Sequence, residues 1–290
     1  MLVNGLLLGG LYALVAVGLS LVWGITNIIN FAHGGMIMLG AYVTFWLFHL
    51  YGVDPFLSLP VSMVMMFFFG LAVHRTLLHS VLKRADFVFS VLLLTFALEM
   101  FLSNAAALAW TADFRSVTVS YAGTSVAIGP VFVPVVDLAV LVTAIVLILG
   151  LWLYLTGTKT GQAILATGLD AEAAKMMGIE VDRIYAVTFA IGSALAGAAG
   201  SLLAILTAVN PYFGGAYTFR AALVGILGGL GSIPGVLLGG IVVGMAETAG
   251  SVLIAPAYRL FVSFVLLVVI LIVRPTGLLG SAFFGRMESE

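Results

Sequence analysis

The stretch TKTGQAILATGLDAEAAKMMGIEVDR, residues 158–183, is the one long polar segment in a chain that is otherwise apolar. The sequence on either side of it has the composition of membrane-spanning segments. We therefore expect residues 158–183 to lie outside the membrane. They are also expected to form the part of the chain that contacts a soluble partner.

A short helix is predicted inside this segment, over residues 171–177. The Asp170 carboxylate can accept hydrogen bonds from the free N–H groups of the following turn, where Glu172 is favoured by the helix dipole. Gly178 supplies a left-handed residue that ends the helix without strain. Apolar side chains that can share one face are Leu169, Ala173, Met176 and Met177. Such a face is typical of a helix that docks into a groove, and the alternative is a capped surface helix without a partner.

The composition of the whole chain indicates its class. Hydrophobic residues make up 63% of the 290 residues, charged residues make up 8%, and the mean hydropathy is +1.26. Soluble domains are only about half apolar. The chain is therefore predicted to be an all-α polytopic membrane protein with little room for a soluble domain. Because it has no cysteine, disulfides, thiolate metal sites and a cysteine nucleophile are excluded.

Apolar runs along the chain predict about eight or nine transmembrane helices. These runs cover residues 2–25, 36–50, 56–73, 87–110, 131–155, 184–208, 219–251 and 258–273. The run 219–251 is interrupted by the glycine-rich stretch 228–235, and the piece before it, about 13 residues at 1.5 Å each, is too short to cross the bilayer upright. A discontinuous or re-entrant helix is therefore predicted there.

Polar residues also interrupt the apolar pattern between the first two runs. Irregular backbone at membrane depth is tolerated where it lines a cavity, although an ordinary interfacial turn is the alternative. The two breaks together give the candidates for a pathway through the membrane, which are Asn27, Asn30, His33, Gly229, Gly231 and Pro234. We expect the two breaks to belong to two repeats that face one another. A metal site at His33 is not expected, because no second ligand lies at a suitable spacing.

The distribution of charge predicts which loops are cytoplasmic. Basic residues gather at 74–84 and again within 158–183, whereas the loop 111–130 has Arg115 as its one cation. Since cytoplasmic loops carry the excess of Lys and Arg, the first two are predicted to be inside and the third outside. Glu99 and Glu247 lie within spans, where we expect structural pairing in preference to contact with a substrate.

Six short motifs, spread over nearly the whole chain, carry a family resemblance. They are GGLYAL at 9–14, NFAHG at 30–34, EAAKMMGI at 172–179, NP at 210–211, GGLGSIPG at 228–235 and RPTG at 274–277. In this order they resemble the permease subunits of bacterial ABC importers for branched-chain amino acids. The resemblance implies one transmembrane permease domain over residues 1–290 and a multi-pass location in the bacterial inner membrane. Some members of the family carry urea or short amides, so the substrate stays open between these classes.

The resemblance also implies partners. They are a second homologous permease subunit, two cytoplasmic ABC ATPase subunits, an extracytoplasmic substrate-binding protein and membrane lipid, with no nucleic acid. Residues 158–183 would then be the loop on which the ATPase docks, and ATP would be bound by the partner subunits, with no cofactor on this chain. The docking residues would be Asp170, Glu172, Ala173, Ala174, Met177 and Gly178.

Two classes of function remain to be separated, an ATP-driven importer subunit and a self-sufficient channel or secondary transporter. No glycine directly precedes a lysine in this chain, so it lacks a phosphate-binding P-loop and is not expected to be an enzyme that hydrolyses ATP. The capped loop helix favours the importer subunit, because a channel has no need of it. The scarcity of acidic residues within the spans argues against an ion-coupled carrier.

Overall fold

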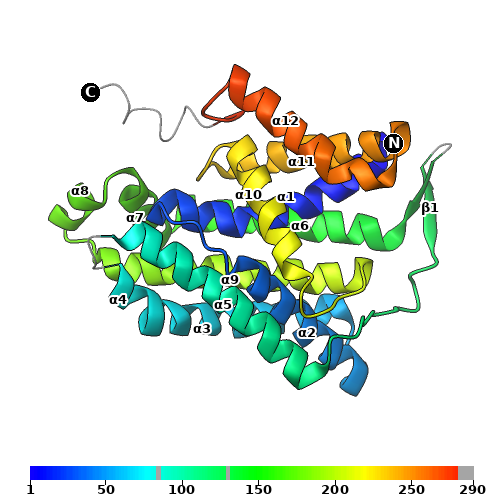
Figure 1. Ribbon diagram of the computed structural model, residues 1–290, viewed down its shortest axis with the longest axis horizontal. Helices are drawn as coiled ribbons and strands as arrows, with labels where there is room; N and C mark the ends of the chain where they lie inside the picture. The colour runs from blue at the N-terminus through cyan, green and yellow to red at the C-terminus, as the bar shows by residue number, and fades with distance from the viewer. Residues whose placement is uncertain (83–85, 129–130, 280–290) are drawn as a thin grey trace.

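The computed structural model describes residues 1–82, 86–128 and 131–279, and this part of the chain is almost entirely helical. Within it, eight helical segments are long and apolar enough to cross a membrane. They are α1 (Leu2–Thr26), α2 (His33–Tyr51), α3 (Pro55–Val73) with its continuation to Val81, α5 (Phe87–Trp110), α6 (Val135–Gly157), α9 (Val181–Leu206), α11 (Ile233–Leu253), and the segment Pro256–Val273, which contains α12 (Arg259–Val273). The predicted all-α polytopic membrane fold is confirmed (Figure 1).

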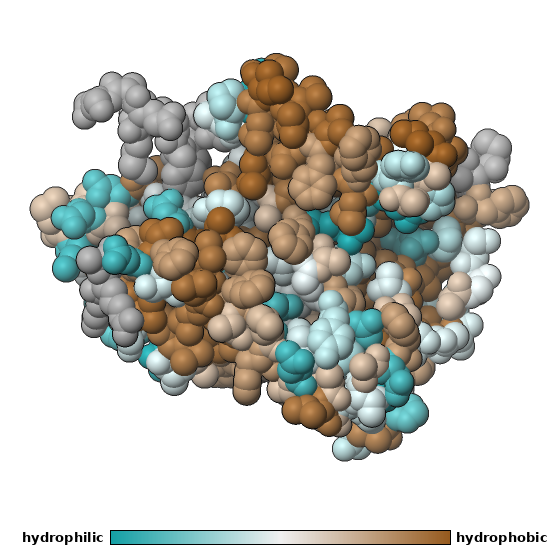
Figure 2. Space-filling view, in the orientation of Figure 1, coloured by the Kyte–Doolittle hydropathy of each residue, from teal (hydrophilic) through white to brown (hydrophobic). Residues whose placement is uncertain are grey.

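Shorter elements connect these spans. They are the π-helix η1 (His74–Leu78) and α4 (His79–Val81), which continue α3, then α7 (Lys159–Leu169), α8 (Ala171–Met176), α10 (Gly214–Gly228), the turn η2 (Pro256–Tyr258), and the strands β1 (Ser125–Ile128) and β2 (Val131–Pro134). The two strands pair antiparallel, with Ser125 opposite Pro134. On the face shown in Figure 2, apolar side chains cover α12 and much of α5, and hydrophilic residues are visible between them.

Helix α1 lies at the centre of the hydrophobic core, where it packs against α11, α9, α10 and α6. Small residues allow the closest of these approaches. A methyl group on Gly240 of α11 would lie 2.7 Å from the Gly9 carbonyl oxygen of α1. Because packing drives helix association in lipid, this glycine-lined crossing is a main source of the stability of the bundle.

The chain contains two repeats, α1–α2–α3 and α9–α10–α11. The first helix of each repeat packs against the third helix of the other, and the two second helices pack against each other. Helices α1 and α9 run in opposite directions across the molecule (Figure 1). Two facing repeats were predicted, but the pairing of the breaks was wrong. The counterpart of the break around Asn30 is the segment that begins at Asn210, whereas the stretch 228–235 separates the second and third helices of the later repeat.

Helix α10 has 15 residues and reaches roughly 22 Å, so it is too short to cross the bilayer upright. It ends where Gly229 and Gly231 adopt positive φ values of 100° and 76°, a conformation that glycine adopts at little cost. The Ser232 hydroxyl then caps α11 by accepting a hydrogen bond of 3.2 Å from the Gly235 N–H. The predicted discontinuous segment is confirmed, with α10 beginning five residues earlier than expected, at Gly214.

Two further elements were not predicted. Residues 159–169 form α7, whose start is capped by the Thr158 hydroxyl 3.0 Å from the Gly161 nitrogen. The β1–β2 hairpin occupies 125–134, so the following span begins at Val135 and not at residue 131. Both segments are short, and their apolar residues were assigned to a loop or to the adjacent span.

The loops divide between two ends of the molecule (Figure 1). At one end η1, α4 and α8 line a common groove, so the two basic loops lie together. At the other end the Arg115 N–H donates to the Val209 carbonyl at 2.9 Å, and the Tyr121 hydroxyl donates to Asp54 at 2.7 Å. Burial, and then this bond to Asp54, raise the pKa of Tyr121 above its ordinary value. We call these the α8 end and the hairpin end.

Candidate docking segment and pathway residues

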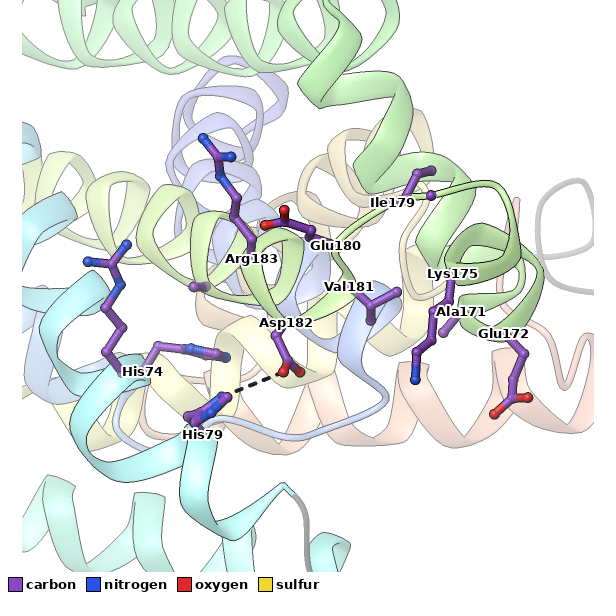
Figure 3. Close-up of a pocket in the computed structure, with 13 residues that line it drawn as sticks. His74, His79, Ala171, Glu172, Lys175, Ile179, Glu180, Val181, Asp182 and Arg183 are labelled. Atoms are coloured by element: carbon purple, nitrogen blue, oxygen red, sulfur yellow. Dashed lines mark ion pairs between the residues drawn. The ribbon is translucent and has the colours of Figure 1, made fainter.

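The groove at the α8 end has a volume of about 860 Å³ and lies between the π-helix η1 and the segment from α8 to α9 (Figure 3). Its lining includes side chains of both charges, which are Arg75, Lys175, Arg183, Glu172, Glu180 and Asp182. One ion pair crosses it, with His79 Nδ1 4.0 Å from the Asp182 carboxylate. The groove is therefore open, carries charges of both signs and is formed by the two basic loops together.

The helix predicted at Asp170 is confirmed as α8. The Asp170 carboxylate accepts hydrogen bonds from the N–H groups of Glu172 at 2.9 Å and of Ala173 at 3.0 Å. Gly178 follows the helix with a φ of 84°. The predicted cap at Asp170 and the predicted left-handed residue at Gly178 are therefore both present in α8 and the turn that follows it.

The predicted docking residues face in different directions. Met176 and Met177 are 83% and 84% exposed, and Glu172 and Gly178 are also exposed. Ala174, in contrast, is buried against its own chain with 5% exposure, so it is not available to a partner. Ala173 is half-buried. The expectation that Ala174 would lie in a partner's groove is thus corrected, because this residue attaches α8 to the rest of the permease.

The two pathway candidates with buried polar side chains have structural roles. His33 is 1% exposed and its Nε2 lies 2.9 Å from the Val15 carbonyl of α1. Asn30 is 2% exposed, and its side-chain oxygen accepts a hydrogen bond of 3.1 Å from the Ala32 N–H. Neither side chain reaches the surface of this chain. Within this chain His33 holds the start of α2 against the middle of α1, and Asn30 caps the turn before α2. That both residues line a pathway stays a prediction.

The other pathway candidates gather near the α8 end. Asn27 is exposed and ends α1 in a left-handed conformation. The Gly231 N–H donates to the Ser20 hydroxyl of α1 at 3.1 Å, and a methyl group on Gly24 would lie 2.5 Å from the Gly231 Cα. Gly229 is buried and Pro234 is exposed. The structure therefore brings both predicted breaks to the same end of α1.

The segments that precede α2 and α10 have the same local structure. The sequences are NFAHGG at 30–35 and NPYFGG at 210–215. Asn210 accepts from the Tyr212 N–H at 2.9 Å, in the same way that Asn30 accepts from Ala32. Gly34 and Gly214 lie in direct backbone contact. The starts of α2 and α10 therefore meet inside the bundle. The signal for this arrangement in the sequence was the repeated spacing from Asn to Gly-Gly.

Charged residues inside the spans are held by other parts of the chain. Glu99 accepts a hydrogen bond from the Gly35 N–H at the start of α2. Glu247 is completely buried and accepts from the hydroxyls of Tyr12 at 2.7 Å and of Ser263 at 2.9 Å. The expected structural pairing of both acids is confirmed. Arg220, with its Nε 3.6 Å from Glu247, was missed, although it is the one Lys or Arg between Arg183 and Arg259.

Eight apolar helical segments, the short helix α10 whose start meets that of α2 inside the bundle, and an exposed short helix at one end define a multi-pass membrane protein of the permease class. The chain belongs to the family described as branched-chain amino acid transport system / permease component, which matches residues 1–271.

Relatives of known name match almost the whole chain. The high-affinity branched-chain amino acid transport system permease protein BraD of Pseudomonas aeruginosa is 33% identical over 96% of this chain and 94% of its own length. The corresponding protein LivH of Escherichia coli K12 is 32% identical over the same shares. A probable LivH of Methanocaldococcus jannaschii is 29% identical over 96% of this chain and 91% of its own. No solved structure matches the chain.

Proposed function

We propose that this chain is a membrane-spanning permease subunit of an ABC importer that moves branched-chain amino acids across the bacterial inner membrane. The energy comes from ATP hydrolysed by two cytoplasmic ATPase subunits. A second homologous permease subunit completes the membrane part, and an extracytoplasmic binding protein delivers the substrate. The proposal is supported by the family and by the names of the relatives.

The single observation that carries the docking role is the exposure of α8. Its Met176 and Met177 side chains are almost free of contact with their own chain, and Glu172 stands beside the open groove. Apolar side chains exposed in this way at the end of a membrane protein favour a protein partner over water. Methionine is flexible, so it adapts well to a partner's groove.

The connections of α8 explain how a partner would move the spans. Asp170 alone separates α8 from α7, and a short turn leads from α8 into α9. Gly168 of α7 packs on Ile25 near the end of α1, beside the break that contains Asn27 and close to Gly231. Movement of α8 therefore reaches α9 directly and reaches both breaks through α7. In this proposal the exposed residues Asn27 and Pro234 and the half-buried Gly231 lie at the cytoplasmic mouth of the pathway.

The test is charge reversal at Glu172 in the assembled transporter. We expect Glu172→Arg to insert normally into the membrane and to lose co-purification with the ATPase, together with ATP-dependent leucine uptake. Asp113→Arg is the matched control, since it makes the same change on an exposed residue of the hairpin end. Retained ATPase binding and uptake in Glu172→Arg would refute the docking role.

The alternatives predict different transport data. An importer for urea or short amides would move urea in preference to leucine. A self-sufficient channel or secondary transporter would move its substrate without ATP and without a co-purifying ATPase. Uptake of leucine and of urea into vesicles, each with and without ATP, separates these three possibilities.

A further inference from the structure

Arg220 is a cation inside the bundle whose interactions with its own chain are incomplete. It lies in the second turn of α10, and its guanidinium group stands 5.7 Å from the ring centre of Tyr12 and 5.4 Å from that of Tyr217. Tyr12 is close to the middle of α1. Within the described residues, the buried Nε of Arg220 has no hydrogen-bond partner. A charge at such depth is costly and normally marks a functional contact.

Pairing with Glu247 does not account for this arrangement. The Arg220 Nε is 3.6 Å from Glu247, which is too long for a good hydrogen bond. Glu247 is already held by two hydroxyl donors, Tyr12 and Ser263, and is completely buried. The contact with Glu247 is made through Nε, and no hydrogen bond of the two terminal nitrogens to Glu247 is found in the described residues. The Arg220 side chain retains 18% exposure, which leaves part of it open to a ligand.

A row of three phenylalanine rings begins at Phe219, the residue that precedes Arg220 in α10. Phe219, the preceding residue, is largely exposed, and its ring centre lies 6.5 Å from that of Phe31. Phe31 in turn contacts the exposed Phe96 of α5, with ring centres 6.3 Å apart. These three rings join α10, the start of α2 and α5.

We propose that Arg220 binds the carboxylate of the transported amino acid, and that Phe31, Phe96 and Phe219 contact its apolar side chain. This inference deepens the proposed function and rests on it. A guanidinium group matches a carboxylate through two parallel N–H···O bonds. The two tyrosine rings fix the orientation of the guanidinium. The Glu247 carboxylate lowers the net positive charge of the site, so the substrate binds but can still dissociate.

The test is equilibrium binding of radiolabelled leucine to the purified permease–ATPase complex in nanodiscs, without the binding protein. Leucinamide serves as a competitor, because it keeps the side chain and the amine but lacks the carboxylate. We expect leucinamide to compete about 10- to 100-fold more weakly than leucine, as charged hydrogen bonds are involved.

Three variants separate recognition of the carboxylate from a structural role. Arg220→Gln combined with Glu247→Gln removes both charges together and leaves no unpaired acid in the bundle. It is expected to weaken leucine binding about 10- to 100-fold and to abolish the preference for leucine over leucinamide. Arg220→Lys keeps the cation and is expected to keep that preference at weaker affinity. Arg259→Gln removes an exposed cation of α12 and is the control that binds as the wild type does.

The inference is wrong if the double variant still prefers leucine, or if leucinamide binds to the wild-type complex as tightly as leucine does. It is also wrong if the wild-type complex does not bind leucine while the complete system imports it, and the proposed function then stands. If the complete system with its binding protein imports no leucine, the proposed function itself fails.

Discussion

Gly178 shows at the scale of one residue how backbone conformation supports the docking helix. Its φ is 84°, and no atom lies within 4 Å of the position that a Cβ would occupy. A substitution there is therefore strained by the backbone conformation and not by crowding. Valine in a left-handed conformation costs about 1–2 kcal/mol, whereas asparagine adopts it more readily.

We expect Gly178→Val to remain in the membrane, to bind the ATPase more weakly and to lose substrate-stimulated ATP hydrolysis. Gly178→Asn, which has the same open space but the better backbone preference, is expected to retain more of both. Co-purification and ATPase assays in nanodiscs measure the difference. Equal behaviour of the two variants would show that the left-handed conformation has no role in docking.

A second prediction concerns the buried carboxylate of Glu247. Tyr12→Phe removes a hydroxyl that donates to it at 2.7 Å, which leaves a buried charged group short of one donor and costs about 1–3 kcal/mol. The thermal unfolding midpoint of the purified permease in detergent is therefore expected to fall. Tyr258→Phe, at an exposed tyrosine, is the control. An unchanged midpoint in Tyr12→Phe would mean that Ser263 and Arg220 suffice for Glu247.

Residue-level features were predictable from sequence where they depend on neighbours along the chain. The Asp170 cap and the Gly178 stop use only the backbone of the adjacent turns. The burial of Ala174 and the pairing of Arg220 with Glu247 depend on which helices lie side by side, and local sequence does not contain that information. Asn30 and His33 have structural contacts at membrane depth, because Asn30 accepts from the Ala32 N–H before α2 and His33 lies within hydrogen-bond distance of the Val15 carbonyl in α1.

At the scale of the element, the contact between the starts of α2 and α10 admits no side chain. A methyl group on Gly34 would overlap the Gly214 carbonyl, and a methyl group on Gly214 would overlap the Gly34 carbonyl. The next residue, Gly215, has nothing within 4 Å of its Cβ position. Because both sides of the contact are backbone, no side chain can rotate to relieve the overlap.

We therefore expect Gly34→Ala and Gly214→Ala each to lower the thermal stability of the permease and to reduce leucine uptake, while Gly215→Ala behaves as the wild type. The two damaging variants are expected to be similar because they disturb the same contact from its two sides. Stability in detergent and uptake in vesicles provide the measurements. If Gly34→Ala changed neither stability nor uptake, the starts of α2 and α10 would separate without a cost in free energy.

Hydropathy identified the spans well, since their length and composition are fixed by the bilayer. It failed for α7 and for the β1–β2 hairpin. Helix α7 mixes apolar residues that pack toward the bundle with polar residues of the surface, and so it resembled a loop. The two strands are only four residues each and Ser125, Val126 and Ala127 are all exposed, a weak signal next to a strongly apolar span.

At the scale of the whole molecule, the two ends differ in charge and in structure. The basic loops share the α8 end, and the loop that contains Arg115 lies at the hairpin end (Figure 1). Because the chain has no cysteine, single cysteines report the side on which each end lies. Exposed positions suitable for this purpose are Ser80, Thr160 and Ser116.

We expect cysteines at Ser80 and Thr160 to resist an impermeant thiol reagent in intact cells and a cysteine at Ser116 to react, in agreement with the positive-inside rule. Permeabilised cells are the control, since all three cysteines then become accessible. Labelling at Thr160 from outside would place α8 on the wrong side for a cytoplasmic ATPase.

The two repeats were only partly visible in the sequence. Two breaks were recognised because polar residues and glycine stood out from an apolar background. The true counterparts are Asn30 with Asn210 and Gly34 with Gly214. The residues between Asn and Gly differ at every position of the two segments, and only the spacing is the same. The packing of α1 on α11 and of α9 on α3 makes their equivalence plain.

The central place of α1 has a consequence for the synthesis of the chain. This helix leaves the ribosome before the other helices described here, yet 89% of its apolar window is covered in the finished protein, and much of that cover is α11, which is made long after it. Until α11 arrives, the glycine-lined side of α1 must face lipid or the insertion machinery. The inserted helices therefore stay apart at first, and the core around α1 closes only after α11 has been made.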